Sequence, residues 1–172
     1  MNAAMVVLRV VHIGCAVFWG GTMFFFATYL EPTTRGLGPA AAPVMQGLEK
    51  RGYFTVMPII AAIAILSGAT MLWIDSAGFS PAWMGSRAGM AYSTGGLAAV
   101  VALGIGLGVM RPTMLKVGAL VASAASVPDG PARQAHLAPM AALRARITVG
   151  VRWTALLLTV AVVSMAVARY LG

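Results

Sequence analysis

Long apolar runs alternate with short polar stretches along the whole chain. Four of these runs are long enough to cross about 30 Å of hydrocarbon at about 1.5 Å per helical residue. The predicted spans cover residues 4–30, 53–74, 88–110 and 147–170. Pro32 and Pro112 follow the first and third runs, where proline predicts the end of a helix. The pattern therefore predicts an all-α polytopic membrane protein, a single domain built as a four-transmembrane-helix bundle.

The polar connections differ in length and composition. Residues 31–52 are rich in glycine and proline, which predicts an irregular loop, and residues 75–87 predict a short interfacial turn. Within the longest connection, we expect residues 114–125 to lie as a helix on the membrane surface. A further helix is expected from Ala132 into the fourth span. No sequence repeat is evident.

Composition agrees with lipid as the main solvent. Of 172 residues, 60% are hydrophobic and only 9% are charged, with a mean hydropathy of +0.88. A soluble domain devotes about a quarter of its residues to charge. The net charge of +8 comes from basic residues scattered in loops and at span ends. That distribution favours contact with the lipid bilayer over binding to nucleic acid, so no nucleic-acid partner is expected.

Basic residues also predict the orientation of the bundle. The first and third loops hold most of them: Arg35, Lys50, Arg51, Arg111, Lys116, Arg133, Arg144 and Arg146. The positive-inside rule therefore places these loops in the cytoplasm and both termini on the outer side. The first run has no basic segment before it and exceeds the length of a secretory signal, so we expect a retained helix.

One histidine, His12, lies inside the first span, in the stretch LRVVHIGCAVFWGGTMFFF, and no other predicted span contains one. An ionisable side chain within a bilayer is costly and indicates a functional site. On a helix, His12 shares a stripe with Cys15 and Trp19. A neutral imidazole there is able to ligate a haem iron or a transition metal. The alternative is a histidine that only forms a hydrogen bond across the bundle.

Arginines accompany His12 at the outer side. Arg9 lies one turn before it, and Arg87 and Arg169 reach the same level from the third and fourth spans. His12 itself is expected about 12 Å deep in the outer half of the bilayer. Guanidinium groups at this mouth would pair with haem propionates. The alternative is that each arginine simply extends to the lipid head groups.

Two methionines near the outer ends of their spans, Met90 and Met165, offer a second kind of ligand. A thioether binds haem iron or Cu(I), although methionine more often fills gaps between helices. Cys15, inside the first span, is the single cysteine of the sequence, so no intramolecular disulfide is possible.

Small residues predict close helix packing. In the first span, Ala16 and Gly20 lie four residues apart. The third span has Gly104 and Gly108 at the same spacing, among the glycines Gly95, Gly96, Gly104, Gly106 and Gly108. Glu31 lies at the inner end of the first span, with no evident catalytic partner. No nucleophile–histidine–acid set, CxxC or HExxH motif is present in the sequence.

The motif formed by Leu8, His12 and Trp19-Gly20-Gly21 resembles the first helix of CopD-like membrane domains associated with copper resistance. It is also similar to the first helix of HemJ-type protoporphyrinogen oxidases. The resemblance implies that His12 is a haem or metal ligand and that Trp19 packs nearby. It supplies no second ligand: a five-coordinate haem, a methionine ligand, a haem shared across a dimer and the absence of any cofactor all stay open.

Three functions follow from these observations. The first is binding of haem b or copper through His12, in electron transfer, oxidation or metal handling, in a bacterial cytoplasmic (inner) membrane. The second is a cofactor-free structural subunit, within a homodimer or a larger membrane complex. The third is a small-solute permease, although the spans hold few polar residues to line a path.

Overall fold

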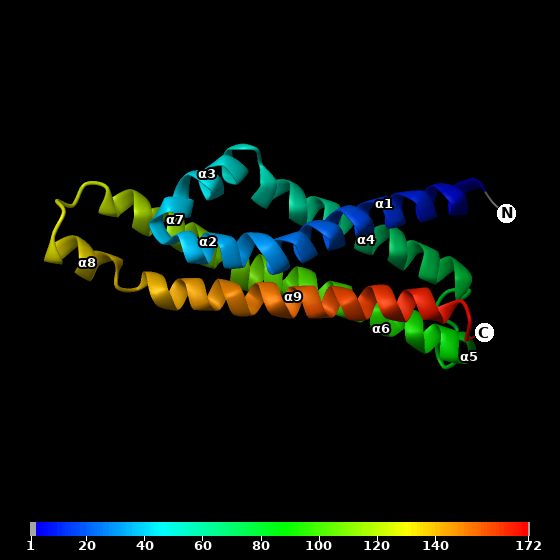
Figure 1. The fold of residues 1–172 in the computed structure, drawn as a ribbon. Helices are drawn as coiled ribbons and strands as arrows, with labels where there is room; N and C mark the ends of the chain where they lie inside the picture. Colours follow the sequence, from blue (N-terminus) through cyan, green and yellow to red (C-terminus); the bar gives the residue numbers. More distant parts are fainter. Residues whose placement is uncertain (1–2, 172) are drawn as a thin grey trace.

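The computed structural model describes residues 3–171, which form an elongated bundle of helices (Figure 1). Four helical stretches are long and apolar enough to cross a membrane: Ala3–Leu37, Tyr53–Asp75, Arg87–Ala124 and Pro131–Ala168. The prediction of an all-α fold with four membrane-length helices is therefore confirmed.

Six elements make up the first two membrane-length stretches and the segment between them. The first stretch consists of α1 (Ala3–Phe25), a π-helical turn η1 (Phe26–Leu30) and α2 (Glu31–Leu37). A 3-10 turn η2 (Gly38–Ala41) and α3 (Ala42–Lys50) lead to α4 (Tyr53–Asp75). Residues 31–52 are thus mostly helical, although an irregular loop was expected. Pro43 lies in the first turn of α3, where the missing N–H costs little.

The second half repeats this order. A short α5 (Pro81–Met84) precedes α6 (Arg87–Ile105), a second π-helical turn η3 (Gly106–Met110) and α7 (Arg111–Ala124). The chain returns through α8 (Pro131–Leu137) and α9 (Met140–Ala168). Because α7 continues the line of α6, residues 114–125 do not form the separate surface helix that was expected (Figure 1).

Neither Pro32 nor Pro112 ends its helix, contrary to the prediction. Each is preceded by a π turn, in which the N–H of Glu31 donates to the carbonyl of Phe26 and that of Arg111 to the carbonyl of Gly106. Proline lacks an N–H and its ring crowds the carbonyl four residues before it. A wider π turn removes that crowding and lets the helix continue.

The two π turns expose a repeat that was not recognised from the sequence. Residues 30–33 read Leu-Glu-Pro-Thr and residues 110–113 read Met-Arg-Pro-Thr, 80 positions apart (112 − 32 = 80). The packing has the same twofold character, since α1 packs chiefly on α4 and α6 chiefly on α9. The bundle is therefore a pair of helix hairpins that resemble each other in build.

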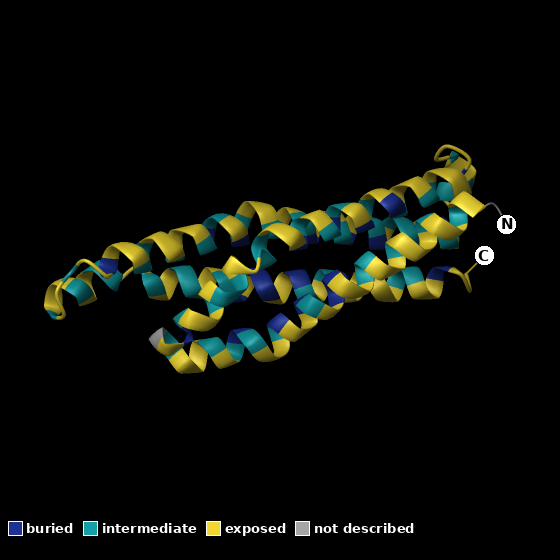
Figure 2. Cartoon of the chain, turned by 90° about the horizontal axis from the view of Figure 1, so that it is seen from above, coloured by how far each residue is buried: buried dark blue, intermediate teal, exposed yellow. Residues whose placement is uncertain are grey.

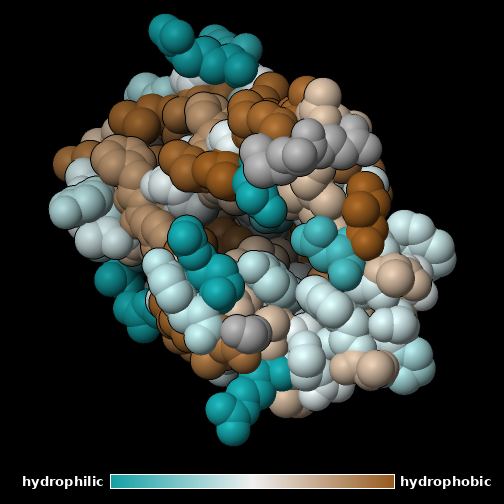
Figure 3. Space-filling model, turned by 90° about the vertical axis from the view of Figure 1, so that its right-hand side faces the viewer, coloured by the Kyte–Doolittle hydropathy of each residue, from teal (hydrophilic) through white to brown (hydrophobic). Residues whose placement is uncertain are grey.

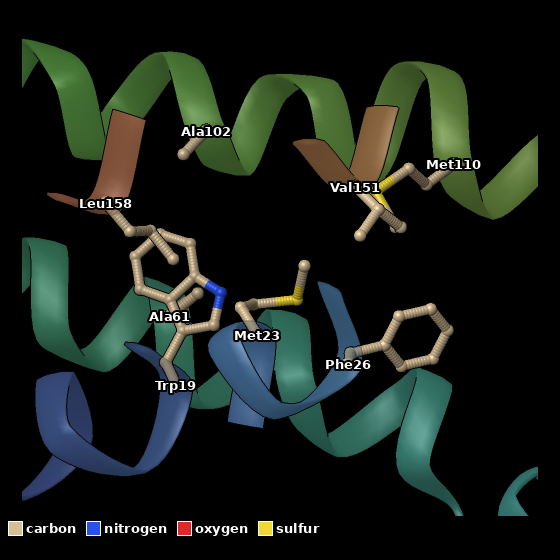
Figure 4. Close-up of a cluster of buried hydrophobic side chains, with 8 residues drawn as sticks. All are labelled: Trp19, Met23, Phe26, Ala61, Ala102, Met110, Val151 and Leu158. Carbon is tan, nitrogen blue, oxygen red and sulfur yellow. The ribbon is translucent and has the colours of Figure 1, made fainter. Parts of the chain in front are cut away.

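The two hairpins meet in an apolar core at mid-length (Figure 4). Every membrane-length helix contributes to it: Trp19, Met23 and Phe26 from the first, Ala61 from the second, Ala102 and Met110 from the third, Val151 and Leu158 from the fourth. Outside this core, most residues of the helices are exposed or half-buried (Figure 2). Many are large and apolar, such as Val10, Leu97 and Leu156, which suits contact with lipid.

Only some of the glycines expected to pack the helices do so. A Cβ added at Gly104 or Gly108 would meet no atom of the described residues within 4 Å, so this pair lies on the outside of the bundle. Gly20 of the first span is buried, and Gly95 of the third span is a close approach, where an added Cβ would lie 3.0 Å from the Ala161 carbonyl oxygen. At Gly150 the same atom would lie 2.9 Å from Met110 Cγ.

The two ends of the bundle carry different elements. The end that carries residues 3 and 171 is called the termini end, and the end that carries α3, α7 and α8 is called the loop end (Figure 1).

Candidate functional site

His12 faces α4 rather than lipid. Its Nδ1 lies 2.7 Å from the carbonyl oxygen of Ala64, to which it donates a hydrogen bond. The ring packs directly against Gly68, where an added Cβ would lie 2.7 Å from His12 Cε1 and 2.9 Å from Nδ1. Glycine at position 68 therefore makes the space that the imidazole occupies.

The hydrogen bond to Ala64 fixes the tautomer of His12. With the proton on Nδ1, the neutral ring keeps Nε2 unprotonated and able to bind a metal. A backbone carbonyl that accepts from the second ring nitrogen is the usual partner of a metal-ligating histidine. The same bond also satisfies a histidine that has only a packing role.

The three arginines expected around His12 have exposed side chains: Arg9, Arg87 and Arg169. The Arg169 guanidinium carbon lies 5.0 Å from the centre of the Tyr170 ring. Figure 3 shows that the termini end is hollowed between the helices, with hydrophobic groups in the hollow and hydrophilic groups around it.

The two candidate methionines lie in the second hairpin. Met165 packs between α9 and α6, where its Cγ would lie 2.9 Å from a Cβ added at Gly95. Met90 is 53% exposed. His12 makes its contacts in the other hairpin, with α4.

His12 offers one nitrogen ligand to a haem or a metal ion. Among residues 3–171, no group of three or more His, Cys, Asp and Glu side chains is placed to hold a metal ion. A copper site needs several protein ligands, whereas haem iron is already held by its macrocycle and needs only one axial histidine. His12 with a free Nε2 meets that smaller requirement.

A second polar site lies at the loop end, around Glu31. This side chain is only 9% exposed. The Thr148 hydroxyl donates a hydrogen bond to Glu31 Oε1 at 2.5 Å, and Arg35 Nε lies 3.9 Å from the same oxygen. Glu31 was expected only to mark the end of a span. The sequence did carry one signal for this site, because a charged residue precedes Pro-Thr both at position 31 and at position 111.

Glu31 forms part of the wall of a cavity of about 720 Å³ between α2, α3, α7 and α9. Its charged lining comprises Glu31, Arg35, Glu49, Arg111 and Arg144. Its apolar lining includes Phe26, Met45, Phe54, Met114, Leu115 and Ile147. We call this the loop-end cavity. Its volume lies in the range of small-molecule sites, about 300–1,000 Å³.

A smaller cavity of about 80 Å³ lies nearer the bundle centre, against Trp19, Met23 and Ala61. It shares Phe26, Phe54, Arg111 and Met114 with the lining of the loop-end cavity. The two spaces are therefore neighbours, and the apolar wall extends from the loop end towards the core.

No protein family model, no curated protein and no solved structure gives a significant match to this chain. Function must therefore be inferred from the residues and their geometry.

Proposed function

We propose that this chain is an integral membrane protein that binds haem b through Nε2 of His12. The observation that carries the proposal is the 2.7 Å hydrogen bond from His12 Nδ1 to the Ala64 carbonyl, which leaves Nε2 as the free ligand atom. The proposed class of function is electron transfer or oxidation in a bacterial cytoplasmic membrane. The proposed orientation has both termini outside, as the distribution of lysine and arginine favours.

Each of the chain's own groups has a defined task in this proposal. The Ala64 carbonyl orients the imidazole, and Gly68 leaves room for it. The arginines of the termini end compensate the propionate charges. Haem, when bound, supplies one-electron chemistry. The resemblance of the first helix to CopD-like and HemJ-type proteins supports the same assignment, and copper is the weaker candidate because no ligand cluster accompanies His12 among the described residues.

The test is the absorption spectrum of the purified protein, before and after dithionite. We expect a Soret band that shifts on reduction and is lost in His12→Ala. His136→Ala is the matched control, because His136 lies on α8 with its Nε2 2.7 Å from the Ser123 hydroxyl, and this variant should keep the band. Absence of a Soret band in the natural protein would overturn the proposal, and bound copper without that band would favour the weaker candidate instead.

A structural subunit is the second candidate, favoured by the outward position of Gly104 and Gly108. Two glycines four residues apart on a lipid-facing surface let another helix approach closely. The double variant Gly104→Leu/Gly108→Leu should then lower the mass of the detergent-solubilised assembly, measured by light scattering. An unchanged mass would exclude this surface as the contact.

A further inference from the structure

We propose that the loop-end cavity binds an anionic phospholipid, with its phosphate at Arg111 and Arg144 and an acyl chain along the apolar wall. This site is separate from His12, which lies near the other end of α1, so the two proposals succeed or fail independently.

The charges of the cavity favour an anionic group. Glu31 is already engaged by the Thr148 hydroxyl and faces Arg35, so it is largely compensated. Within residues 3–171, neither Arg111 nor Arg144 has an acidic side chain within ion-pair distance. The other acidic residue of the lining, Glu49, is exposed. Two guanidinium groups without a carboxylate partner match the oxygens of a phosphate.

Two π turns precede charged residues that line the cavity. Glu31 and Arg111 each follow directly after a π turn, and both line the cavity. A π turn adds a residue to the helix and so changes the face on which later side chains lie. The Leu/Met-Glu/Arg-Pro-Thr repeat thus delivers one acidic and one basic side chain to the same cavity.

The position of the cavity along the membrane normal favours a lipid of the bilayer as its ligand. Glu31 follows Arg9 by 22 residues (31 − 9 = 22) along one continuous helical stretch. At about 1.5 Å per residue this is about 33 Å, close to the thickness of the hydrocarbon core. When Arg9 lies among the head groups of one leaflet, the cavity lies among those of the other.

The walls fit the remainder of a lipid. Phe26, Met45 and Met114 give the loop-end cavity an apolar side, and the small neighbouring cavity extends it towards Trp19 and Met23. A soluble phosphate compound would leave this apolar surface without a partner, whereas an acyl chain would cover it. We therefore commit to a lipid with a net negative head group.

The test is native mass spectrometry of the full chain, purified in detergent and stripped of lipid. Phosphatidylglycerol, phosphatidylcholine and inorganic phosphate are titrated separately. We expect one phosphatidylglycerol per chain, bound at least about tenfold more tightly than phosphatidylcholine, and no competition by inorganic phosphate. Equal affinity for the two lipids, or displacement by phosphate alone, would overturn the proposal.

Variants locate the binding within the cavity. Arg111→Gln/Arg144→Gln should weaken phosphatidylglycerol by about tenfold or more. Arg146→Gln is the matched control, because Arg146 lies on the same helix, is exposed and does not line the cavity. Met114→Trp keeps both arginines and fills the apolar wall, so it should also weaken binding. An equal loss in Arg146→Gln, or full binding in Met114→Trp, would contradict the assignment.

Discussion

Thr148 on α9 donates a hydrogen bond to Glu31 on α2 at 2.5 Å, and this bond joins the two hairpins at the loop end. The partners are 117 residues apart in the sequence, and both are buried. A carboxylate is tolerated at such a position only when its oxygens find donors. The bond therefore helps to set how the first helix lies against the last.

Loss of this donor should destabilise the bundle. In Thr148→Val, Glu31 Oε1 stays buried without the hydroxyl, which costs about 1–3 kcal/mol in the free energy of unfolding. Thr159→Val is the matched control, because Thr159 is exposed and donates only to the Ala155 carbonyl of its own helix. The measurement is reversible unfolding in mixed detergent micelles. Equal losses in the two variants would show that the contact to Glu31 contributes nothing.

Gly68 should be specifically required beside His12. In Gly68→Ala the new methyl group would lie 2.7 Å from His12 Cε1, so the ring or α4 must move. We expect a loss of about 1–3 kcal/mol in the free energy of unfolding. In the haem-loaded protein that we propose, the Soret band should also weaken, because the bond from Nδ1 to Ala64 is disturbed.

Gly21→Ala, a substitution on the first helix, is the control for Gly68→Ala. No atom of the described residues lies within 4 Å of a Cβ added at Gly21, so the free energy of unfolding should not fall and the spectrum should stay unchanged. An unchanged Soret band in Gly68→Ala would show that haem binding by His12 does not require glycine at position 68.

Adjacent glycines on α6 should respond in opposite ways to the same substitution. A Cβ at Gly95 would lie 3.0 Å from the Ala161 carbonyl oxygen, and backbone cannot move aside cheaply. Gly95→Ala should therefore cost about 1–3 kcal/mol. At Gly96 an added Cβ meets no described atom within 4 Å, and alanine is the better helix former, so Gly96→Ala should stabilise the protein by up to about 1 kcal/mol. Thermal unfolding of both variants in one detergent tests the pair.

The sequence predicted the spans well because lipid imposes a simple rule on them. A membrane-length apolar run has to be helical, since no water is present to satisfy its backbone. The second span was expected over residues 53–74 and is observed as Tyr53–Asp75. The first and third helices extend further than expected, because the π turns before Pro32 and Pro112 let the helices pass through the prolines.

The central contact of the polar site at the loop end could not be predicted from the sequence. It joins Glu31 to Thr148, and although Glu31 belongs to the repeated motif before Pro-Thr, nothing in the sequence pairs it with Thr148. Likewise, Gly104 and Gly108 show the spacing of a packing motif, but the sequence does not say which face of the helix meets its neighbours. His12 was the exception, because the cost of a histidine in lipid predicts that it faces another helix, as it does.

The orientation of the bundle is open to a direct test with single cysteines. In a Cys15→Ser background, Ser126→Cys reports on the turn between α7 and α8, and Ala82→Cys reports on α5. Both positions are exposed. Because loops one and three carry most of the basic residues, a membrane-impermeant maleimide added to intact cells should label Ala82→Cys and spare Ser126→Cys. After the cells are opened, both should react. The reverse pattern in intact cells would place the termini in the cytoplasm and move His12 to the inner half of the membrane.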